Sequence, residues 1–340
     1  MPQSEKYRDA NINRTGPGDA RPTALQIVRD AGVLGKLNDK VALITGCTSG
    51  IGIETARALH ETGATVFITG KDASEAQKVA NEIINKEGSN KAPIHVLEFD
   101  LASLESVRKG AKEFLSQSDR LNILVNNAGV MRAPEGRSVD GYETQFATNH
   151  LGHFLLFQLL KDTLLASSTP EFNSRVVVVA STGHRYGQVR FDDYNFEKDP
   201  YDPGKAYGQS KTANIYFACA VERKYGLKGL HALSLHPGAI KTGIQKYTPE
   251  AEPLWELPAI KKYTKTPEQG AATTVYAAVS PDWEGKGGRY IVDCEEVELY
   301  KGVDKLGLTD QGYAKWIYDE EAEERVWKDS NKMVGLEEEA

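Results

Sequence analysis

The stretch that decides the fold is Lys40-Val41-Ala42-Leu43-Ile44-Thr45-Gly46-Cys47-Thr48-Ser49-Gly50-Ile51-Gly52. Its first part, from Val41 to Ile44, is a continuous apolar run, which is typical of a strand buried on both faces. A glycine-rich turn follows, and a helical pattern begins directly after it. Such a turn directs backbone N–H groups and the positive end of the helix toward one point. That point suits a phosphate group, and a turn without a ligand is the alternative.

Strands and helices alternate from this stretch onward. The strands are expected at 41–44, 65–69, 94–99, 122–126, 175–180, 231–235 and 290–292, and the main helices at 53–60, 74–86, 104–115, 141–163 and 207–225. This alternation predicts an α/β fold with a doubly wound, parallel, seven-stranded sheet of the Rossmann type. In such sheets, ligands bind beyond the carboxyl ends of the strands, so we expect the functional site at that edge.

Two extensions flank the single α/β domain, which we place at residues 38–300. Residues 1–37 begin with a polar stretch that we expect to be an extended tail. A short helix follows, which Thr23 caps and which docks on the domain; an exposed helix that binds a partner is the alternative.

Residues 301–340 are expected to form a helical extension, with a charged helix over 310–333. The side chains expected to dock this helix are Trp316, Ile317, Val326 and Trp327.

Composition and charge exclude several classes of protein. The chain has 340 residues and a net charge of −7, with Lys and Arg scattered along it, so we expect no nucleic-acid partner. No run of about 18 apolar residues occurs, so we expect no membrane span. The three cysteines are far apart, so we expect no metal site and no disulfide, and a cytoplasmic location.

Tyr207 and Lys211 are the first candidates for chemistry. Their spacing of four places both side chains on one face of a helix. A nearby ammonium group favours the tyrosinate, so we expect the pKa of Tyr207 to be lowered from about 10, which suits proton transfer at a carbonyl oxygen. Tyr201 and Lys205 have the same spacing, but Pro203 lies between them, so we expect no helix there. A surface lysine beside a core tyrosine is the alternative for either pair.

Polar residues near three other elements support this interpretation. Ser181 follows an apolar strand, where its hydroxyl faces the ligand edge and can hold a carbonyl group; a turn cap is the alternative. Asn126-Asn127-Ala128-Gly129 follows another strand in the same way. Asn149 is a polar residue on a largely apolar helix, where we expect it to bond the backbone and relay a proton through water.

These features together resemble the short-chain dehydrogenase/reductase family. The resemblance rests on the turn at 45–52, Asn126 to Gly129, Asn149, Ser181, Tyr207, Lys211 and the pair Pro237-Gly238. It covers about residues 38–300. The long interval between Ser181 and Tyr207 and the added chain at both ends are more similar to the retinol-dehydrogenase and WW-domain-oxidoreductase branch. We expect neither a membrane anchor nor a WW domain here.

The resemblance implies a role for each catalytic residue. Tyr207 would be the general acid and base. Lys211 would bind the nicotinamide ribose and lower the pKa of the tyrosine. Ser181 would orient the carbonyl group, and Asn149 would complete the proton relay.

The resemblance also implies the cofactor contacts. Asp100 would contact the adenine, Asn127 would line the adenosine side, and the segment 237–242 would cover the nicotinamide. Gly70 stands where the family's NAD-selecting Asp would be, and Lys71 stands where a basic residue binds the 2′-phosphate, so we expect NADP(H). The expected cofactor residues are Thr45, Gly46, Thr48, Ser49, Gly50, Ile51, Gly52, Lys71, Asp100, Leu101, Asn127, Ala128, Gly129, Tyr207, Lys211, Pro237, Gly238, Ile240 and Thr242.

A long loop at about 239–266 begins beside the expected nicotinamide position. The loop contains more apolar residues, such as Trp255 and Leu257, than we expect of a solvent-exposed loop without a function. We therefore expect a lid that closes over an apolar substrate. Packing of these residues on the domain or on another subunit is the alternative.

The sequence therefore predicts an NADP(H)-dependent oxidoreductase that interconverts a ketone or aldehyde and an alcohol on a lipophilic small molecule. A catalytically silent nucleotide-binding sensor or scaffold is one alternative. Other chemistry at the same site, such as epimerisation or dehydration, is another. The assembly is expected to be a homodimer, paired through the helices that hold Asn149 and Tyr207, or a monomer.

Overall fold

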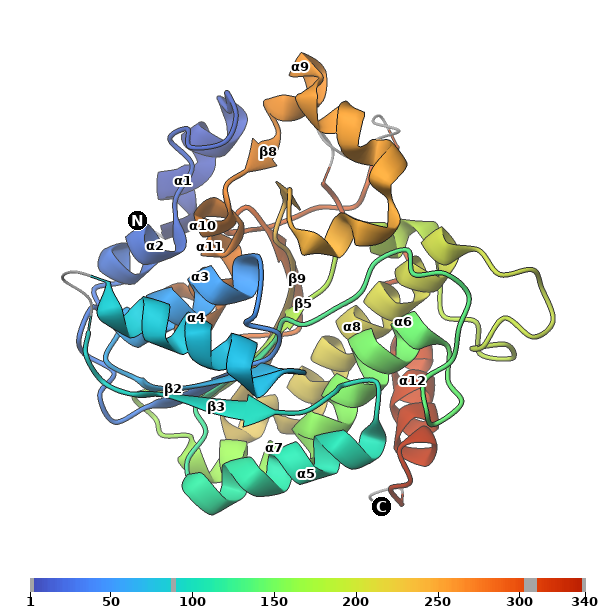
Figure 1. Ribbon diagram of the computed structural model, residues 1–340, viewed down its shortest axis with the longest axis horizontal. Coiled ribbons are helices and arrows are strands. Elements are labelled where there is room, and N and C mark those ends of the chain that lie inside the picture. The colour runs from blue at the N-terminus through green and yellow to red at the C-terminus, as the bar shows by residue number, and fades with distance from the viewer. Residues whose placement is uncertain (1–2, 87–89, 303–310, 338–340) are drawn as a thin grey trace.

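The computed structural model describes residues 3–86, 90–302 and 311–337, and in this part of the chain the central sheet has eight strands (Figure 1). Their order is β10-β9-β6-β5-β4-β1-β2-β3. The bounds are β1 Val41–Ile44, β2 Thr65–Gly70, β3 Ile94–Glu98, β4 Ile123–Asn126, β5 Ser174–Val179, β6 Leu230–His236, β9 Arg289–Val292 and β10 Glu295–Glu296.

The parallel, doubly wound sheet expected from the sequence is confirmed, but its strand number is corrected. Seven strands pair in parallel, and β10 pairs antiparallel with β9 at one edge. Because β10 consists of only two glutamates, it carries no apolar pattern that could predict a strand.

Helices cover both faces of the sheet, and each face has its own apolar cluster. One face is covered by α2 Ala24–Asp30, α3 Ile51–Glu61, α4 Ala73–Asn85 and α11 Ala272–Val279, and the other by α5 Leu104–Gln117, α7 Gly152–Ser167, α8 Pro203–Tyr225 and α12 Glu320–Met333. Neighbouring residues of a strand point to opposite faces. Ile44 accordingly belongs to the first cluster and Leu43 to the second, which is why β1 is apolar throughout.

The N-terminal extension differs from the expected extended tail, because Gln3–Ile12 forms helix α1. Few of its residues are apolar, so the sequence carries no clear helical pattern. The helix is held by distant contacts instead: Tyr7 is buried, and its hydroxyl donates a hydrogen bond of 2.6 Å to Asp30 of α2. The cap expected at Thr23 is present, and α2 packs against α3 and α11 with Ile27 and Val28 fully buried.

Two helices near the site begin at other residues than the pattern predicts. The helix expected from Gly141 begins as α6 Thr144–Phe146, passes through a π-helical turn at Ala147–Leu151 and continues as α7. The Glu143 side chain caps its start by accepting the N–H groups of the first turn. The helix expected from Tyr207 begins one turn earlier as α8, because Asp202 caps it and a proline suits its first position.

The C-terminal helix is shorter than expected. Residues 311–319 form turns, and α12 begins only after Asp319, which caps it; the expected start at Asp310 lies outside the described residues. The expected docking is present, because Ile317, Val326 and Trp327 are each at most 5% exposed. Trp327 packs among the aromatic rings of α7 and α8.

The loop at residues 239–266, hereafter the lid, contains short regular elements. It opens with strand β7 Ala239–Ile240 and ends with strand β8 Thr264–Lys265, and these two pair in parallel. Between them lie two 3₁₀ turns and the short helix α9 Pro258–Lys261 (Figure 1). Among residues 3–86, 90–302 and 311–337, no helix is both long and apolar enough to cross a bilayer.

Candidate active site

A cleft of about 570 Å³ lies at the carboxyl edge of the sheet, between the strand ends and the lid. Most of the residues expected at the site line it, namely Gly46, Thr48, Ser49, Gly50, Ile51, Gly52, Lys71, Leu101, Asn127, Ala128, Gly129, Ser181, Tyr207, Lys211, Pro237, Gly238, Ile240 and Thr242. Three expected residues lie behind the lining or beside it: Thr45 and Asn149 are fully buried, and Asp100 sits next to Lys71.

The glycine-rich turn fits a dinucleotide phosphate. Gly50 precedes α3 with a φ of +62° and offers no side-chain cap, so no side chain occupies the first N–H groups of the helix. Gly46 has a φ of +71°, and a Cβ there would lie 2.7 Å from the Cβ of Ala128. The turn therefore brings the backbone itself to the cleft wall, as an approach to phosphate oxygens requires.

The Thr45 hydroxyl joins this turn to the strand beside it. Its oxygen accepts hydrogen bonds from the backbone N–H groups of Asn127 (3.0 Å) and Ala128 (3.1 Å). The Asn127 side-chain amide in turn donates to the carbonyl oxygens of Thr45 (2.8 Å) and Gly46 (3.2 Å). Thr45 therefore positions the cleft wall from behind, although the sequence suggested that it contacts the cofactor.

His153 connects Thr45 to Asn149 and was not expected from the sequence. Its Nδ1 lies 2.9 Å from the Asn149 carbonyl oxygen, and its Nε2 lies 2.8 Å from the Thr45 hydroxyl. A carbonyl oxygen only accepts, so Nδ1 carries the hydrogen and Nε2 of the neutral ring accepts from Thr45. His153 stands four residues after Asn149 in a largely apolar part of the helix, and this spacing is the sequence signal that could have identified it.

Asn149 lies in the π-helical turn and is held by its side chain, as the sequence suggested. Its amide donates to the Val130 carbonyl oxygen (3.0 Å) and accepts from the Val130 N–H (2.8 Å). It also donates to the Ser210 hydroxyl of α8 (2.9 Å). Gly129 separates Asn149 from the cleft, because a Cβ at Gly129 would lie 3.1 Å from the Asn149 amide oxygen and 3.5 Å from the Lys211 Nζ.

Ser181, Tyr207 and Lys211 meet at one end of the cleft. Ser181 lies two residues beyond the end of β5, and its hydroxyl accepts the Gly183 N–H at 3.0 Å, so the cap role and the cleft position coexist. The Tyr207 ring packs on Gly183, where a Cβ would lie 2.7 Å from the ring. Lys211 donates from Nζ to the Val179 carbonyl oxygen at 2.8 Å and lies 5.7 Å from the centre of the Tyr207 ring.

The expected lowering of the tyrosine pKa is wrong. Burial raises the pKa of Tyr207 to about 12, and a hydrogen bond with Ser181 opposes this only in part. Burial also lowers the pKa of Lys211 to about 7. The helical spacing predicted the proximity of the two groups correctly, but burial penalises the charge on both of them.

The comparison pair Tyr201 and Lys205 is not aligned by a helix, as expected, although α8 does begin between them, at Pro203. Lys205 stands in the first turn of α8, whereas Tyr201 precedes the helix, so helical spacing does not align them. The Tyr201 hydroxyl donates to the Ala133 carbonyl oxygen (2.9 Å) and contacts the Glu143 carboxylate (3.1 Å). Tyr201 does not line the cleft.

The C-terminal extension also reaches the site, through His184. The His184 Nδ1 donates to the Ser181 carbonyl oxygen (2.6 Å), and its Nε2 accepts from the Ala314 N–H (3.0 Å). His184 is fully buried in the 3₁₀ turn Thr182–Tyr186. A segment 130 residues away in the chain thus fixes the backbone of Ser181, a link that no local sequence pattern reveals.

The far end of the cleft contains the residues expected to bind the adenosine part. Lys71 forms an ion pair of 2.8 Å with Asp100, and the two side chains are 62% and 39% exposed. Asp72 does not pair with Lys71, because its carboxylate caps α4 by accepting the N–H groups of Ser74 and Glu75. The Lys71 ammonium group is therefore held only by a weak surface ion pair.

Some residues of the lid line the cleft and others do not. Trp255 lines the cleft, together with Met131 and Ile244. Leu257 is 48% exposed and does not line the cleft, so its expected role at the substrate is wrong.

Comparisons with known proteins agree with this site. A family model described as short chain dehydrogenase matches residues 40–253. The chain is 48% identical over 335 residues to the short-chain dehydrogenase/reductase prx1 of Penicillium roqueforti, covering 98% of this chain and 96% of that protein. It is 38% identical to retinol dehydrogenase 14 of Mus musculus, covering 89% of this chain and 88% of that protein.

Among solved structures, an uncharacterised protein from Mycobacterium paratuberculosis superposes with a TM-score of 0.68 and 28% identity, covering 91% of this chain and 98% of that one. Fold and relatives together define an oxidoreductase of the Rossmann class that uses a nicotinamide dinucleotide. The chain belongs to the short-chain dehydrogenase/reductase family, and retinol dehydrogenases are among its relatives.

Replacing Tyr207 by Phe is expected to lower kcat by about a hundredfold or more, because the variant keeps the ring but lacks the hydroxyl group that is expected to transfer the proton. Cofactor affinity should change little. Steady-state kinetics and a fluorescence titration with the reduced cofactor measure the two effects. Tyr201→Phe is the matched control and should keep near wild-type kcat; a Tyr207→Phe variant that did the same would refute the assignment.

The second prediction concerns the pH dependence of stability through His153. Burial lowers the pKa of His153 to about 4, and the nearby Lys211 also disfavours its charge, whereas an unfolded histidine titrates near pH 6.5. Between these values the unfolded chain binds more protons, so the contribution of the neutral ring to stability is complete above pH 6.5 and is lost as the pH falls toward 4. Urea unfolding should show a smaller decrease in stability from about pH 7.5 to about pH 4.5 in His153→Gln than in wild type.

His150, His184 and His236 remain in both proteins and also have a lowered pKa. The charge of His153 contributes to the lowered pKa of His150, so the difference between the two curves reports His153 together with its effect on His150. Parallel curves would mean that the pKa of His153 is the same in the folded and the unfolded protein.

Proposed function

We propose that this protein is an NADP(H)-dependent oxidoreductase that interconverts a ketone or aldehyde and an alcohol on a lipophilic small molecule, with Tyr207 as the general acid and base. The observation that carries the proposal is the meeting of Ser181, Tyr207 and Lys211 at one end of a cleft whose other wall is the glycine-rich turn. A protein that only senses a nucleotide has no need of this set.

In the reducing direction, bound NADPH would supply the hydride to the carbonyl carbon. The hydroxyl groups of Ser181 and Tyr207 would hold the carbonyl oxygen by hydrogen bonds. As negative charge develops on that oxygen, Tyr207 gives it the phenolic proton, which completes the alcohol. A pKa of about 12 keeps this proton on the phenol until the oxygen becomes basic.

Lys211 and Asn149 support the proton transfer from behind. Lys211 has a pKa of about 7, so a charged Lys211 would stabilise the tyrosinate that remains after the transfer. Asn149 holds the Val130 backbone beside the cleft and, with His153, fixes the π-helical turn there. The Asn149 amide also donates to the Ser210 hydroxyl, so this network links the Val130 backbone beside the cleft to α8.

The choice of NADP(H) rests on Lys71. Its ion pair with Asp100 is exposed, and such pairs contribute only about 0–1 kcal/mol, so a 2′-phosphate can compete for the ammonium group. The carboxylate nearest in sequence, Asp72, is engaged as a helix cap. The strand end carries Gly70 in place of an acidic residue that would hold the ribose hydroxyls of NAD.

Lys71→Ala should weaken NADPH binding by about tenfold, the effect typical of one charge-assisted hydrogen bond, and leave NADH binding nearly unchanged. Dissociation constants for both cofactors, measured by fluorescence titration at constant ionic strength, test this. Lys78→Ala is the control for a lysine on α4 that does not line the cleft. Tighter binding of NADH than of NADPH by the wild type would overturn the cofactor assignment.

The lipophilic substrate is supported by the lid. Met131, Ile244 and Trp255 give the cleft an apolar wall, and closure over it would exclude water from the hydride path. The name of the mouse relative states retinol, which is a lipophilic alcohol. Both point to an extended apolar molecule with one carbonyl or hydroxyl group.

Trp255→Ala should raise KM for such a substrate by about tenfold, because the truncated side chain no longer shields the apolar part of the substrate from water. NADPH binding should not weaken. A panel of aldehydes, ketones and alcohols of rising chain length, followed by nicotinamide absorbance, measures the effect. Leu257→Ala removes a side chain of the same lid that faces away from the cleft, so its KM should stay near wild type. Equal effects of the two substitutions would show that the lid merely packs.

A further inference from the structure

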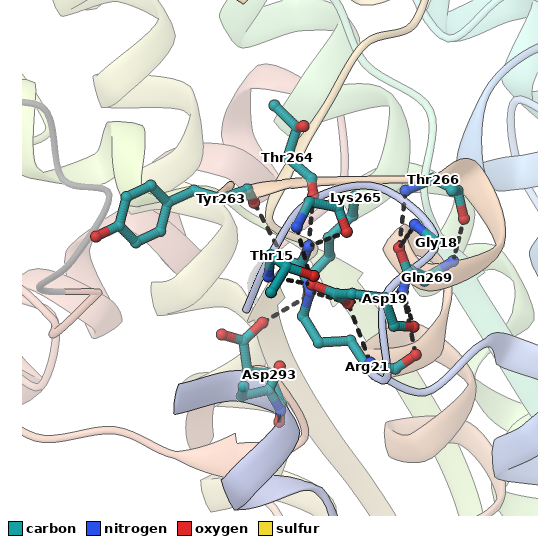
Figure 2. A network of polar contacts seen from close by, with 12 residues as sticks. Thr15, Gly18, Asp19, Arg21, Tyr263, Thr264, Lys265, Thr266, Gln269 and Asp293 are labelled. Carbon is teal, nitrogen blue, oxygen red and sulfur yellow. Dashed lines mark hydrogen bonds and ion pairs between the residues drawn. The ribbon is translucent and has the colours of Figure 1, made fainter. Parts of the chain in front are cut away.

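A buried arginine of the N-terminal extension holds the base of the lid. Residues 14–21, hereafter the strap, cross the end of the lid beside β8 (Figure 2). Arg21 is 3% exposed, and its guanidinium donates to the carbonyl oxygens of Tyr263 (3.1 Å) and Thr264 (2.6 Å). It also donates to the Gly16 carbonyl oxygen (3.0 Å) and to the Asp19 carboxylate (2.8 Å).

Asp19 stabilises the strap through hydrogen bonds with other residues of the strap. Its carboxylate accepts the N–H groups of Thr15, Gly16 and Arg21, besides the Arg21 side chain. A buried ion pair adds little net stability compared with apolar residues of the same volume, since both charges lose their water. Arg21 instead fixes the orientation of the segment at the base of the lid, because its planar guanidinium group binds two neighbouring carbonyl groups at once.

Gln269 fastens the strap on the other side of β8. It lies in the short helix α10 Pro267–Gly270, and its amide nitrogen is within 3.1 Å of the carbonyl oxygens of Asp19 and Arg21. Its amide oxygen accepts the N–H groups of Gly18 (3.0 Å) and Thr266 (3.1 Å). The two ends of the segment 263–269 are thus tied to the same few residues of the strap, as Figure 2 shows.

From β8 the contacts continue to the cleft. Ile240 of β7 pairs with Lys265 of β8, and Ile240 lines the cleft. The Lys265 ammonium group is buried, donates to the Pro237 carbonyl oxygen (3.2 Å) and pairs with Asp293 (2.5 Å). A Cβ on Gly238 would lie 2.9 Å from the Lys265 side chain, so the turn at Pro237 rests directly on it.

We propose that the strap is a positioning element for the reaction, and that Arg21 is a positioning residue that acts through β8 and Lys265. By holding the carbonyl groups of Tyr263 and Thr264, Arg21 sets the place of the Pro237–Gly238 turn and of the lid. The wall that faces the nicotinamide end of the cleft is therefore fixed from the N-terminus of the chain. This inference rests on the proposed function for its effect on turnover, but not for its effect on the lid.

Three variants of the full chain test it. Arg21→Met removes the hydrogen bonds of the guanidinium to the base of the lid but leaves Asp19 buried without its partner, which will lower stability. Asp19→Asn/Arg21→Met removes both charges and should regain part of that stability. Arg21→Lys keeps the charge but cannot reach two carbonyl groups in the geometry of the fork. Arg8→Met is the control, because Arg8 belongs to the same extension but is exposed and pairs with Glu295.

The first measurement needs no turnover. Lys261 and Lys262 are exposed on the lid, so trypsin cleavage there reports how firmly the lid is held. We expect cleavage to be faster in all three Arg21 variants, including the double variant after its thermal stability has recovered, and unchanged in Arg8→Met. Cleavage at the wild-type rate in the double variant would overturn the proposal, since Arg21 would then be only a partner for Asp19.

The second measurement uses the active enzyme. Because a small displacement at a reacting centre is costly, the double variant should raise the NADPH dissociation constant or KM by about tenfold or more per folded enzyme. Wild-type constants in a variant with a loosened lid would also overturn the proposal. A wild type that binds NADPH but turns over no carbonyl or alcohol would refute the proposed function, while the trypsin result would still decide the role of the strap.

Discussion

The hydroxyl group of Thr45 is the contact on which the site depends. It stands where β1 enters the glycine-rich turn, and it accepts the N–H groups of Asn127 and Ala128, which begin the segment after β4. Through His153 the same oxygen reaches the backbone of Asn149. One buried hydroxyl group therefore sets the distance between the phosphate-binding turn, the opposite cleft wall and the π-helical turn. A parallel sheet brings these segments near one another, but only directional hydrogen bonds fix them to fractions of an ångström.

Each end of the chain adds a second layer of support to this core. The C-terminal extension fixes the Ser181 backbone through the contact between Ala314 and His184. The N-terminal extension reaches the opposite wall, through Arg21 and β8. Both links use a buried side chain with several hydrogen bonds to hold backbone carbonyl or N–H groups, which restrains position more than it adds stability. The sheet sets the overall arrangement of the site, and the two extensions fix the positions of the loops that line it.

Local sequence signals predicted the features that local physics determines. Three signals depend only on residues close together in the chain: the apolar run of β1, the turn glycines, and the spacing of Tyr207 and Lys211. The parallel sheet follows from the alternation of strands and helices along the sequence. Helix α1 escaped prediction because it is held by Tyr7 and Asp30, 23 residues apart, and not by a pattern of its own. The raised pKa of Tyr207 escaped for a related reason, since burial depends on the whole fold and outweighs the neighbouring lysine. Leu257 shows the limit for loops, where hydrophobicity alone does not tell which side of the lid a residue faces.

The buried Lys211 has one further consequence, which concerns protons in solution. A group with a pKa of about 7 is only partly charged at neutral pH, so an anion that arrives beside it raises its pKa and draws a proton from the solvent. Binding of an anion beside Lys211 would then be linked to proton uptake, and its affinity would fall as the pH rises above about 7 toward the ordinary pKa of a lysine. Occupancy of this end of the cleft by such an anion would therefore depend on the acidity of the solvent.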